Sequence, residues 1–399
     1  MHSQTYDILI IGGGMVGAAL ACALASSGAR LALIEAKAPL TEWPADGHDP
    51  RVSAVTMGSA RFFSALGAWP RMTARRVSPF REMHVWDAAG PGVIHFDSAD
   101  IGAATLGYIV ENRVIQAALY EQSLTFPNVE WITSARIEAL HCDAECAEVS
   151  IDDGRTFNAR LVVGADGADS AVRRLAGVVT RGWEYPQSAL VATVKTAGGH
   201  HETAWQRFLP DGPLAFLPLD DDYSSIVWTL PHARAAQLLA LDDARFRAAL
   251  HEALGENIPG VAQGLGAITE VGPRASFPLR LLHADAYVRP RLALVGDAAH
   301  TVHPLAGQGV NLGLSDAAVL AELLNERLAR GADPGSLSVL RRYERRRKGD
   351  NLAMAAALEG LRCLFGSRAA PLRLARNVGL QLTDAAAPLK NRIMRYAMR

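Results

Sequence analysis

The chain has 399 residues, 49% of them hydrophobic, and its 40 Lys and Arg nearly balance its 41 Asp and Glu. That composition excludes a disordered chain, and the length allows a large core and two domains. The four cysteines form no CxxC pair, and no His or Cys cluster has the spacing of zinc ligands, so no disulfide framework and no metal site are expected. Because no signal peptide and no apolar run of about 20 residues is visible, a cytoplasmic location is expected.

The first expected element is an apolar strand over residues 6–11. It runs into Gly12-Gly-Gly14-Met-Val-Gly17 and an Ala-rich helix over 18–27, and the next strand, over 30–34, ends in an acid. This order is the dinucleotide fingerprint: the glycines allow a tight turn and close approach to a pyrophosphate, and the acid suits a ribose hydroxyl. A glycine turn without a ligand and a solvated strand-end carboxylate are the alternatives. The predicted cofactor-binding residues here are Gly12, Gly14, Gly17 and Glu35.

The middle of the chain alternates between helical and strand patterns. Helices are expected over 59–66 and 112–122, and strands near 129–132, 147–151 and 161–163. The last strand delivers Gly164-Ala-Asp166-Gly167-Ala-Asp-Ser170, which again places an acid and glycines at a strand end before a helix. We expect a third ligand-facing loop here, although Asp169 or Ser170 would equally suit a plain helix N-cap.

Two segments, 78–100 and 181–278, are rich in strand-forming and aromatic residues. They predict one sheet domain inserted twice into a nucleotide-binding domain made of residues 1–77, 101–180 and 279–345. Residues 206–218 and 225–229 are expected to form a hairpin whose apolar face roofs a pocket. Individual aromatic residues at strand spacing are more often core than pocket residues.

A second ligand-binding segment spans residues 292–313. An apolar strand ends in Gly296-Asp297, so a carboxylate is expected at the carboxyl end of a strand, where open α/β sheets bind ligands. Gly307-Gln308-Gly309 follows. Because two of its three residues are glycines, the backbone here can closely approach a flat or anionic ligand. A helix over 311–323 then points its N-terminus back at this loop.

The C-terminal segment, 346–399, is predicted to be helical and basic. From residue 341 onward there are 14 Lys and Arg against 4 Asp and Glu, with apolar helical stretches over 352–365 and 371–382. Helices with apolar and basic faces can lie on an anionic membrane surface or against an acidic partner, whereas a solvated helical cap on the main domain is the alternative. Nucleic acid is not expected as a partner, because no recognisable binding module is present and the rest of the chain is acidic.

In this order and spacing, the glycine loops and acids resemble the FAD-dependent aromatic hydroxylases of the p-hydroxybenzoate hydroxylase fold. Further segments are similar to the ubiquinone-biosynthesis hydroxylases: Asp49-Pro-Arg-Val-Ser-Ala54, Gly107-Tyr-Ile-Val-Glu-Asn112, Trp205-Gln-Arg-Phe-Leu-Pro-Asp-Gly-Pro213, His303-Pro-Leu-Ala-Gly-Gln-Gly-Val-Asn-Leu-Gly-Leu-Ser-Asp316 and Arg376-Asn-Val-Gly-Leu380. The resemblance implies an α/β fold: an FAD/NAD(P)-binding Rossmann-like domain, an inserted, mainly antiparallel substrate sheet and a helical C-terminus.

The resemblance also implies roles for individual residues. The first glycine loop would hold the FAD pyrophosphate and Glu35 its adenosine ribose, while the loop of Asp166 would couple FAD and NAD(P)H binding. The remaining FAD contacts implied are Arg51, Gly296, Asp297, Pro304, Gly307, Gln308, Gly309 and Asn311. One departure from the broader family is Asn112, which replaces an Arg; with Arg113 beside it, neither is assigned a cofactor role.

The implied chemistry is ring hydroxylation. NAD(P)H reduces FAD, O2 adds to give a C4a-hydroperoxide, and one oxygen reaches the ring of a polyprenylated phenol or benzoquinol. His303 borders the predicted flavin loop, Gly307-Gln308-Gly309, and could act as the substrate base, although a histidine satisfied by backbone fits as well. A hydroxylase of a small soluble phenol and an FAD-binding component of a quinone-biosynthesis complex remain alternatives. A location peripheral to the inner membrane, complex partners bound through the basic tail and a homo-oligomer also remain open.

Overall fold

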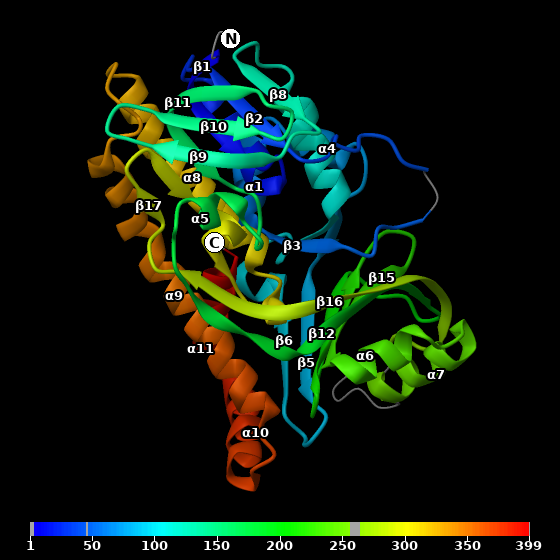
Figure 1. The fold of residues 1–399 in the computed structure, drawn as a ribbon. Helices are drawn as coiled ribbons and strands as arrows, with labels where there is room; N and C mark the ends of the chain where they lie inside the picture. Colours follow the sequence, from blue (N-terminus) through cyan, green and yellow to red (C-terminus); the bar gives the residue numbers. More distant parts are fainter. Residues whose placement is uncertain (1–3, 45–46, 256–263, 399) are drawn as a thin grey trace.

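The computed structural model describes residues 4–44, 47–255 and 264–398. Two large sheets form the body, and helices from the C-terminal part of the chain run along one side of it (Figure 1). The first sheet carries the nucleotide fingerprint, and the second contains most of the two aromatic segments. The C-terminus returns to the middle of the molecule, between the two sheets in this view.

The first sheet has a parallel centre. Its five parallel strands lie in the order β18-β11-β1-β2-β8. They are β1 (Gln4–Ile11), β2 (Leu31–Glu35), β8 (Val129–Thr133), β11 (Thr156–Gly164) and β18 (Leu292–Leu294), and β9 (Ile137–Cys142), β10 (Ala147–Ile151) and β17 (Val288–Arg289) add antiparallel pairs. Because parallel strands end at one edge, this sheet gathers all the glycine and acid loops expected to bind the cofactor.

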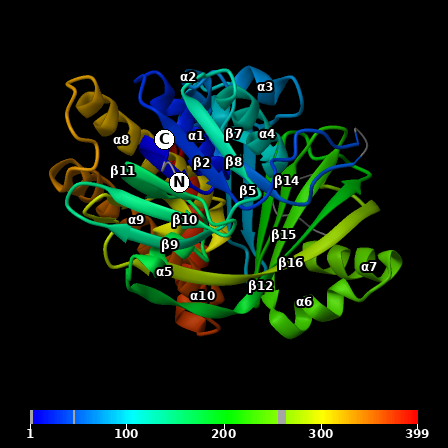
Figure 2. The same ribbon diagram turned by 45° about the horizontal axis from the view of Figure 1, so that its top comes forward.

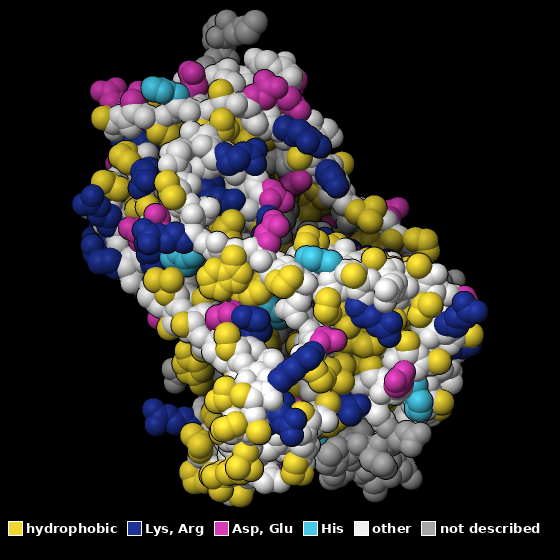
Figure 3. Space-filling view, turned by 60° about the horizontal axis from the view of Figure 1, so that its bottom comes forward, with side chains coloured by type: hydrophobic (Ala, Val, Ile, Leu, Met, Phe, Trp, Pro, Cys, Tyr) yellow, Lys and Arg dark blue, Asp and Glu magenta, His cyan; other side chains and the backbone are white. Residues whose placement is uncertain are grey.

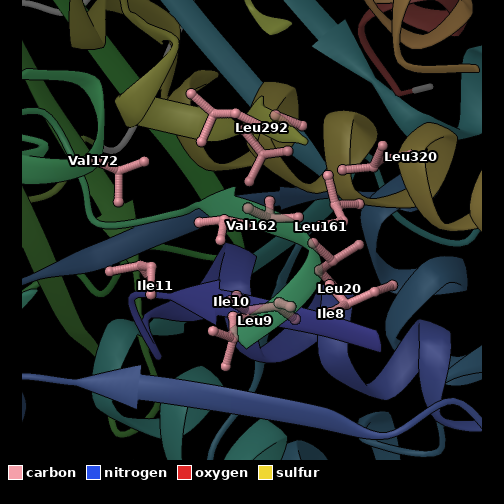
Figure 4. Packing of buried hydrophobic residues seen from close by; sticks show 14 of the residues in the cluster. Ile8, Leu9, Ile10, Ile11, Leu20, Leu161, Val162, Val172, Leu292 and Leu320 are labelled. Carbon is pink, nitrogen blue, oxygen red and sulfur yellow. The ribbon is translucent and has the colours of Figure 1, made fainter. Parts of the chain in front are cut away.

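The core of this domain lies between the parallel strands and their helices. Ile8, Leu9, Ile10 and Ile11 are all buried, as expected for a strand covered on both faces. Figure 4 shows them beside side chains from β11 and from two helices, Leu20 of α1 and Leu320 of α8. Helix α1 (Met15–Ala25) contacts both α4 (Asn112–Ser123) and α8 (Gly309–Leu328). The short helix α5 (Ala171–Leu175) follows β11.

The second sheet has the strand order β19-β16-β12-β15-β14-β13-β5-β6 and is antiparallel except for the β13–β5 pair (Figure 2). Its strands are β5 (Glu82–Asp87), β6 (Val93–Asp97), β12 (Thr180–Thr196), β13 (Thr203–Leu209), β14 (Gly212–Pro218), β15 (Tyr223–Pro231), β16 (Ile268–Ala284) and β19 (His300–Thr301). The expected hairpin is the meander β13-β14-β15. The 17-residue strands β12 and β16 cross the predicted boundaries at 180/181 and 278/279.

The two faces of this sheet have different side chains, because residues alternate along each strand. Trp205, Phe216 and Trp228 point to one face and pack with the helices α6 (His232–Leu239) and α7 (Asp243–Leu254). Smaller residues such as Ala215 point to the other face. The sequence interpretation contained only strands in this segment and missed α6 and α7, which bury the aromatic face.

A three-stranded antiparallel sheet, β3 (Val52–Thr56), β7 (Gly107–Glu111) and β4 (Ser78–Phe80), lies at the junction of the two large sheets. The short helices α2 (Met57–Ala65) and α3 (Trp69–Thr73) contact this sheet, and the short turn η1 (Ser98–Ile101) lies next to β6. Two further short turns, η2 (Gly296–Ala298) and η3 (Pro304–Ala306), flank β19 in the loop region that follows β18.

The C-terminal part is helical, as predicted. It consists of α9 (Leu337–Gly366), α10 (Ala370–Ala385) and α11 (Ala387–Ala397). Helix α9 is continuous through the predicted boundary at residues 345/346, so the body and the tail share one helix. None of the helices in the described part of the chain is long and apolar enough to cross a bilayer.

Candidate cofactor and substrate site

The first glycine loop needs its glycines for different reasons. Gly12 has φ +103°, and a Cβ on it would lie 2.4 Å from the backbone oxygen of Ala165; a Cβ on Gly17 would lie 1.9 Å from the oxygen of Gly12. At both positions a side chain is therefore excluded by the protein's own backbone. At Gly14, by contrast, a Cβ would meet no protein atom within 4 Å, and no side chain caps the first turn of α1. The N-terminus of α1 therefore faces open space with free amides, as an anion site requires.

Glu35 lies at the carboxyl end of β2, next to this loop. Its carboxylate accepts a hydrogen bond from the Gly13 amide at 2.6 Å and another from the Lys37 amide at 3.1 Å. These bonds hold the acid at the same edge as the open amides. The predicted ribose contact is thus placed beside the predicted pyrophosphate contact.

The loop after β11 shows the contacts of a helix cap. Asp166 accepts hydrogen bonds from the Ser170 hydroxyl at 2.5 Å and the Val172 amide at 3.1 Å, and Ser170 itself accepts one from the Arg173 amide. These bonds order the loop where β1 and β11 end side by side. A cofactor role for Asp166 stays a prediction.

Asp297 lies just after the carboxyl end of β18, in the short turn η2. The side chain is accessible to solvent although protein atoms surround it closely. Burial raises its pKa above the ordinary value, and the nearby charges of His300, Arg280 and Arg51 partly offset this. Arg51 is exposed, with its guanidinium 5.2 Å from the centre of the Phe277 ring. Asp297 and Arg51 are 246 positions apart in the sequence, but the fold brings their side chains close enough for their charges to interact.

The glycine loop before α8 has the expected open backbone. Gly307 adopts φ +62°, Gln308 is the N-cap of α8, and a Cβ on Gly309 would meet nothing within 4 Å. Asn311 is buried and its amide is used within the protein. It donates to the Ala54 oxygen at 2.8 Å and accepts from the Thr56 amide at 3.1 Å, which ties α8 to β3. Pro304, Gly307 and Gln308 line the cavity described below.

Asp316 supports this region, and no role was predicted for it. The carboxylate is fully buried and accepts bonds from His300 at 2.5 Å, Arg347 at 2.7 Å and the Gly296 amide at 3.1 Å. Burial alone would raise its pKa, but the charges and hydrogen bonds of His300 and Arg347 outweigh that effect and lower it. The sequence did contain one signal for this buried acid, because Asp316 stands among mostly apolar residues within α8.

His303, the predicted substrate base, is 1% exposed and is not among the residues that line the cavity. Its ring lies edge-on to Tyr185 at 5.1 Å, and neither ring nitrogen has a hydrogen-bond partner among the described residues. Burial lowers its pKa to about 4, and the charge of Arg362 adds to the effect. The alternative, a histidine whose ring is hydrogen-bonded to the backbone, is therefore not seen among the described residues. The role of His303 as a base stays a prediction.

The buried, neutral His303 should make stability depend on pH. The unfolded chain takes up this proton near pH 6.5, but the folded protein does so only near pH 4. Stability is therefore lost as the pH falls from 6.5 towards 4, by about 2 kcal/mol between about pH 7.5 and 5. Urea unfolding of His303→Gln should show a loss smaller by this amount. The same pH dependence in both proteins would contradict a neutral buried imidazole.

A cavity of about 310 Å³ lies between the flavin loop, the three-stranded sheet and the second large sheet. The second sheet contributes its small-residue face, opposite Trp205, Phe216 and Trp228; Phe96 on the edge strand β6 also lines the cavity. Among the described residues that line it, none has an ionisable side chain, and the polar ones are few: Thr56, Gln206, Thr229 and Gln308. The apolar wall consists of Val52, Ala54, Val55, Phe80, Met83, Phe96, Leu106, Ile109, Ala204, Pro213, Ala215, Leu217, Val227, Pro304, Leu305, Ile393, Met394, Ala397 and Met398.

Asn112 and Arg113, the positions that depart from the broader family, are used within the protein. Asn112 accepts a hydrogen bond from the Ser53 hydroxyl at 2.7 Å, and Arg113 pairs with Glu111 at 2.6 Å.

In contrast, the backbone at Gly14 and Gly309 faces open space at two helix N-termini. That arrangement fits an anionic dinucleotide with an electron-rich ring.

Comparison with known proteins agrees with this geometry. A family model described as FAD binding domain matches residues 5–356. The chain is 39% identical to 3-demethoxyubiquinol 3-hydroxylase of Escherichia coli (strain K12), over 100% of both chains. It is 41% identical to ubiquinone hydroxylase UbiL of Rhodospirillum rubrum, over 98% of this chain and 89% of that protein. Its fold is similar to that of p-nitrophenol 4-monooxygenase PnpA from Pseudomonas putida DLL-E4, with a TM-score of 0.80 at 19% identity over 99% and 98% of the two chains.

The FAD-binding family model and the hydroxylase relatives identify the chain as an FAD-dependent monooxygenase. Within that class, the chain belongs to the family of ubiquinone-biosynthesis hydroxylases. The predicted family, the α/β fold class and FAD as cofactor are thereby confirmed. The contacts of individual residues with FAD, and the division into domains by residue number, stay predictions.

Proposed function

We propose that the protein hydroxylates the ring of a polyprenylated phenol or benzoquinol. The observation that supports this most directly is the apolar cavity between the flavin loop and the small-residue face of the second sheet. Bound FAD, reduced by NAD(P)H, supplies the activation of O2. The names of the E. coli and R. rubrum relatives agree with such a substrate.

The chain itself would bind, orient and exclude water. The open amides at Gly14, together with Glu35, would hold the adenosine side of FAD, and Asp297 would hold the ribityl chain. The amides at the start of α8 would face the isoalloxazine and favour negative charge on it. The apolar wall keeps the reacting ring dry, which suppresses wasteful loss of activated oxygen.

Orientation of the ring is proposed to depend on a few polar side chains. Gln206 and Thr229 come from neighbouring parts of the second sheet and line the cavity with Gln308 and Thr56. An amide or hydroxyl can hydrogen-bond to a ring hydroxyl, but none of these groups is a base at neutral pH. The reaction should therefore need a ring that is already electron-rich.

Filling the cavity tests this function. In Ala215→Phe, a large side chain would project from the small-residue face of β14 into the cavity. We expect kcat/KM for a polyprenylated phenol to fall about 5- to 150-fold, the equivalent of about 1–3 kcal/mol of overpacking. FAD content should stay unchanged. The measurement is substrate-stimulated NAD(P)H oxidation, with mass spectrometry of the oxygenated product.

Ala236→Phe is the matched control, because Ala236 is exposed on α6, which covers the opposite face of the same sheet. Its turnover should equal that of the wild type. Efficient turnover of small soluble phenols without turnover of polyprenylated ones would favour the soluble-phenol hydroxylase. FAD binding without any substrate-stimulated oxidation would favour an assembly component.

A polyprenyl chain partitions into lipid, which bears on where the protein works. We therefore propose a cytoplasmic location peripheral to the inner membrane, with the basic C-terminal part as the contact. The excess of Lys and Arg after residue 341 supports attraction to an anionic surface.

A further inference from the structure

The two last helices expose rows of large apolar side chains. On α10, Leu374, Val378 and Leu382 follow each other at four-residue spacing, so they share one face, and Leu374 and Leu382 are 68% and 65% exposed. On α11, Leu389, Ile393 and Tyr396 form a similar row. Figure 3 shows hydrophobic side chains gathered at the end of the molecule to which α10 extends, with Lys and Arg at their borders. We call these two rows the outer face.

The charged residues of α10 and α11 themselves are almost all positive. The exposed charged residues of this part are Arg368, Arg373, Arg392 and Arg395. Asp384, the one acid of the two helices, is partly buried and lies 3.4 Å from Lys390. Large apolar side chains bordered by Arg are the pattern of a helix that lies in the interface of an anionic bilayer.

The opposite side of α11 is part of the cavity wall. Met394, 3% exposed, and Met398 line the cavity together with Ala397. Ile393 belongs to both sides, because it lines the cavity and is 41% exposed. A single helix therefore separates the cavity from the outer face.

Buried polar contacts hold these helices against the body. Arg376 pairs with Asp87 at 2.6 Å, with both side chains almost fully buried, and also donates to the oxygen of Phe365 at the end of α9. Asn377 donates to Asp87 at 2.8 Å and accepts from the Gly92 amide at 2.6 Å. This clamp fixes the orientation of α10, so that its apolar row faces away from the body.

Helix α11 has weaker attachments. The Asn391 amide donates to the Asp100 oxygen at 3.1 Å, Lys390 lies 3.4 Å from the Asp100 carboxylate, and the Gly58 amide donates to the Met398 oxygen at 3.0 Å. Two of these contacts come from the first half of the helix and one from the residue after its C-terminus. Its middle touches the body mainly through the methionines that line the cavity.

We propose that the outer face of α10 and α11 inserts into an anionic phospholipid bilayer, and that the substrate passes between bilayer and cavity beside α11. The polyprenyl chain would then contact Met394 and Met398, while its end remains in lipid. The substrate class in this inference rests on the proposed function. The route spares the apolar chain any exposure to water, which is unfavourable for each of its CH2 groups.

A bilayer fits the outer face better than a protein partner does. The exposed leucines lie on helices with a clear excess of positive charge. Asp211 lies 3.4 Å from Arg368 and Asp100 lies 3.4 Å from Lys390, but Arg373, Arg392 and Arg395 have no ion-pair partner among the described residues. A protein partner would be expected to meet a patch with paired charges of both signs at its rim. A lipid surface, by contrast, binds such a helix through burial of its apolar side chains and attraction between its cations and anionic headgroups.

The test uses the FAD-loaded full-length protein and the double variant Leu374→Glu/Leu382→Glu, whose positions do not line the cavity. The matched control is Leu124→Glu, because Leu124 is 54% exposed at the end of α4, away from α10. Binding is measured by flotation with phosphatidylcholine vesicles containing phosphatidylglycerol. Turnover is measured with a short-chain soluble phenol and with a long-chain polyprenylated phenol in the same vesicles.

The double variant should lose vesicle binding and long-chain turnover by about ten-fold or more, since two buried leucines contribute well over 1.4 kcal/mol. Its FAD content, melting temperature and short-chain turnover should match the control. Unchanged vesicle binding, or lost binding with unchanged long-chain turnover, would overturn the proposal. If the wild type floats but oxidises neither phenol, the proposed function fails while the lipid contact stands.

Discussion

Replacing Asp316 by Ala is expected to lower the free energy of unfolding by about 3–5 kcal/mol, because it leaves the buried Arg347 without its main partner. The Gly296 amide and His300 lose an acceptor in the same step. Since Gly296 precedes the predicted ribityl contact, FAD retention should fall as well. Urea unfolding and the FAD content of the purified protein measure the two effects.

Asp350→Ala is the matched control. Asp350 pairs with the same Arg347 at 3.2 Å, but its side chain is 72% exposed, so water can replace the contact. Little change in stability and full FAD content are expected. Equal effects of the two substitutions would show that the burial of Asp316 does not matter.

Gly14→Ala and Gly17→Ala are expected to reduce FAD binding for different reasons. At Gly17 the new Cβ would lie 1.9 Å from the Gly12 oxygen, so the loop must move, which destabilises even the protein without FAD by about 1–3 kcal/mol. At Gly14 the Cβ meets no protein atom within 4 Å, so the stability without FAD should stay unchanged. FAD affinity should nevertheless fall about ten-fold or more, because the methyl group projects where the pyrophosphate is predicted.

Gly349→Ala serves as the control for both variants. It lies in α9, and a Cβ there also meets no atom within 4 Å. A gain of about 0.5–1 kcal/mol and normal FAD binding are expected from helix propensity alone. FAD titration monitored by flavin fluorescence, together with unfolding of the protein without FAD, separates the cases. Normal affinity in Gly14→Ala would place the cofactor elsewhere.

The cofactor half of the site could be predicted because each part of it is local. A strand, a glycine loop and a helix start within about a dozen residues are encoded by short-range backbone preferences. Gly12, Glu35, Gly164 and Gly296 each lie at or just after the carboxyl end of a parallel strand, so one sheet edge brings them together once the strands pair. Such spacing is visible in the sequence before any tertiary contact is known.

The substrate half was decided by contacts between distant parts of the chain. Alternation predicts two faces for β14, but it does not tell which face is covered by α6 and α7 and which is left for a substrate. The same holds for Met394, which reaches the cavity only because the Asp87–Arg376 pair, 289 residues apart, orients the tail. Asp316 and Arg347 likewise became partners through the packing of α8 against α9.

The sequence by itself therefore determined the family, the α/β fold, the glycine loops and the basic, helical nature of the tail. Tertiary structure decided the wall of the cavity, the buried network behind the Gly296 loop and the burial of His303. The physical reason is range: backbone geometry and periodicity act over a few residues, whereas a cavity is the space left when remote surfaces have packed.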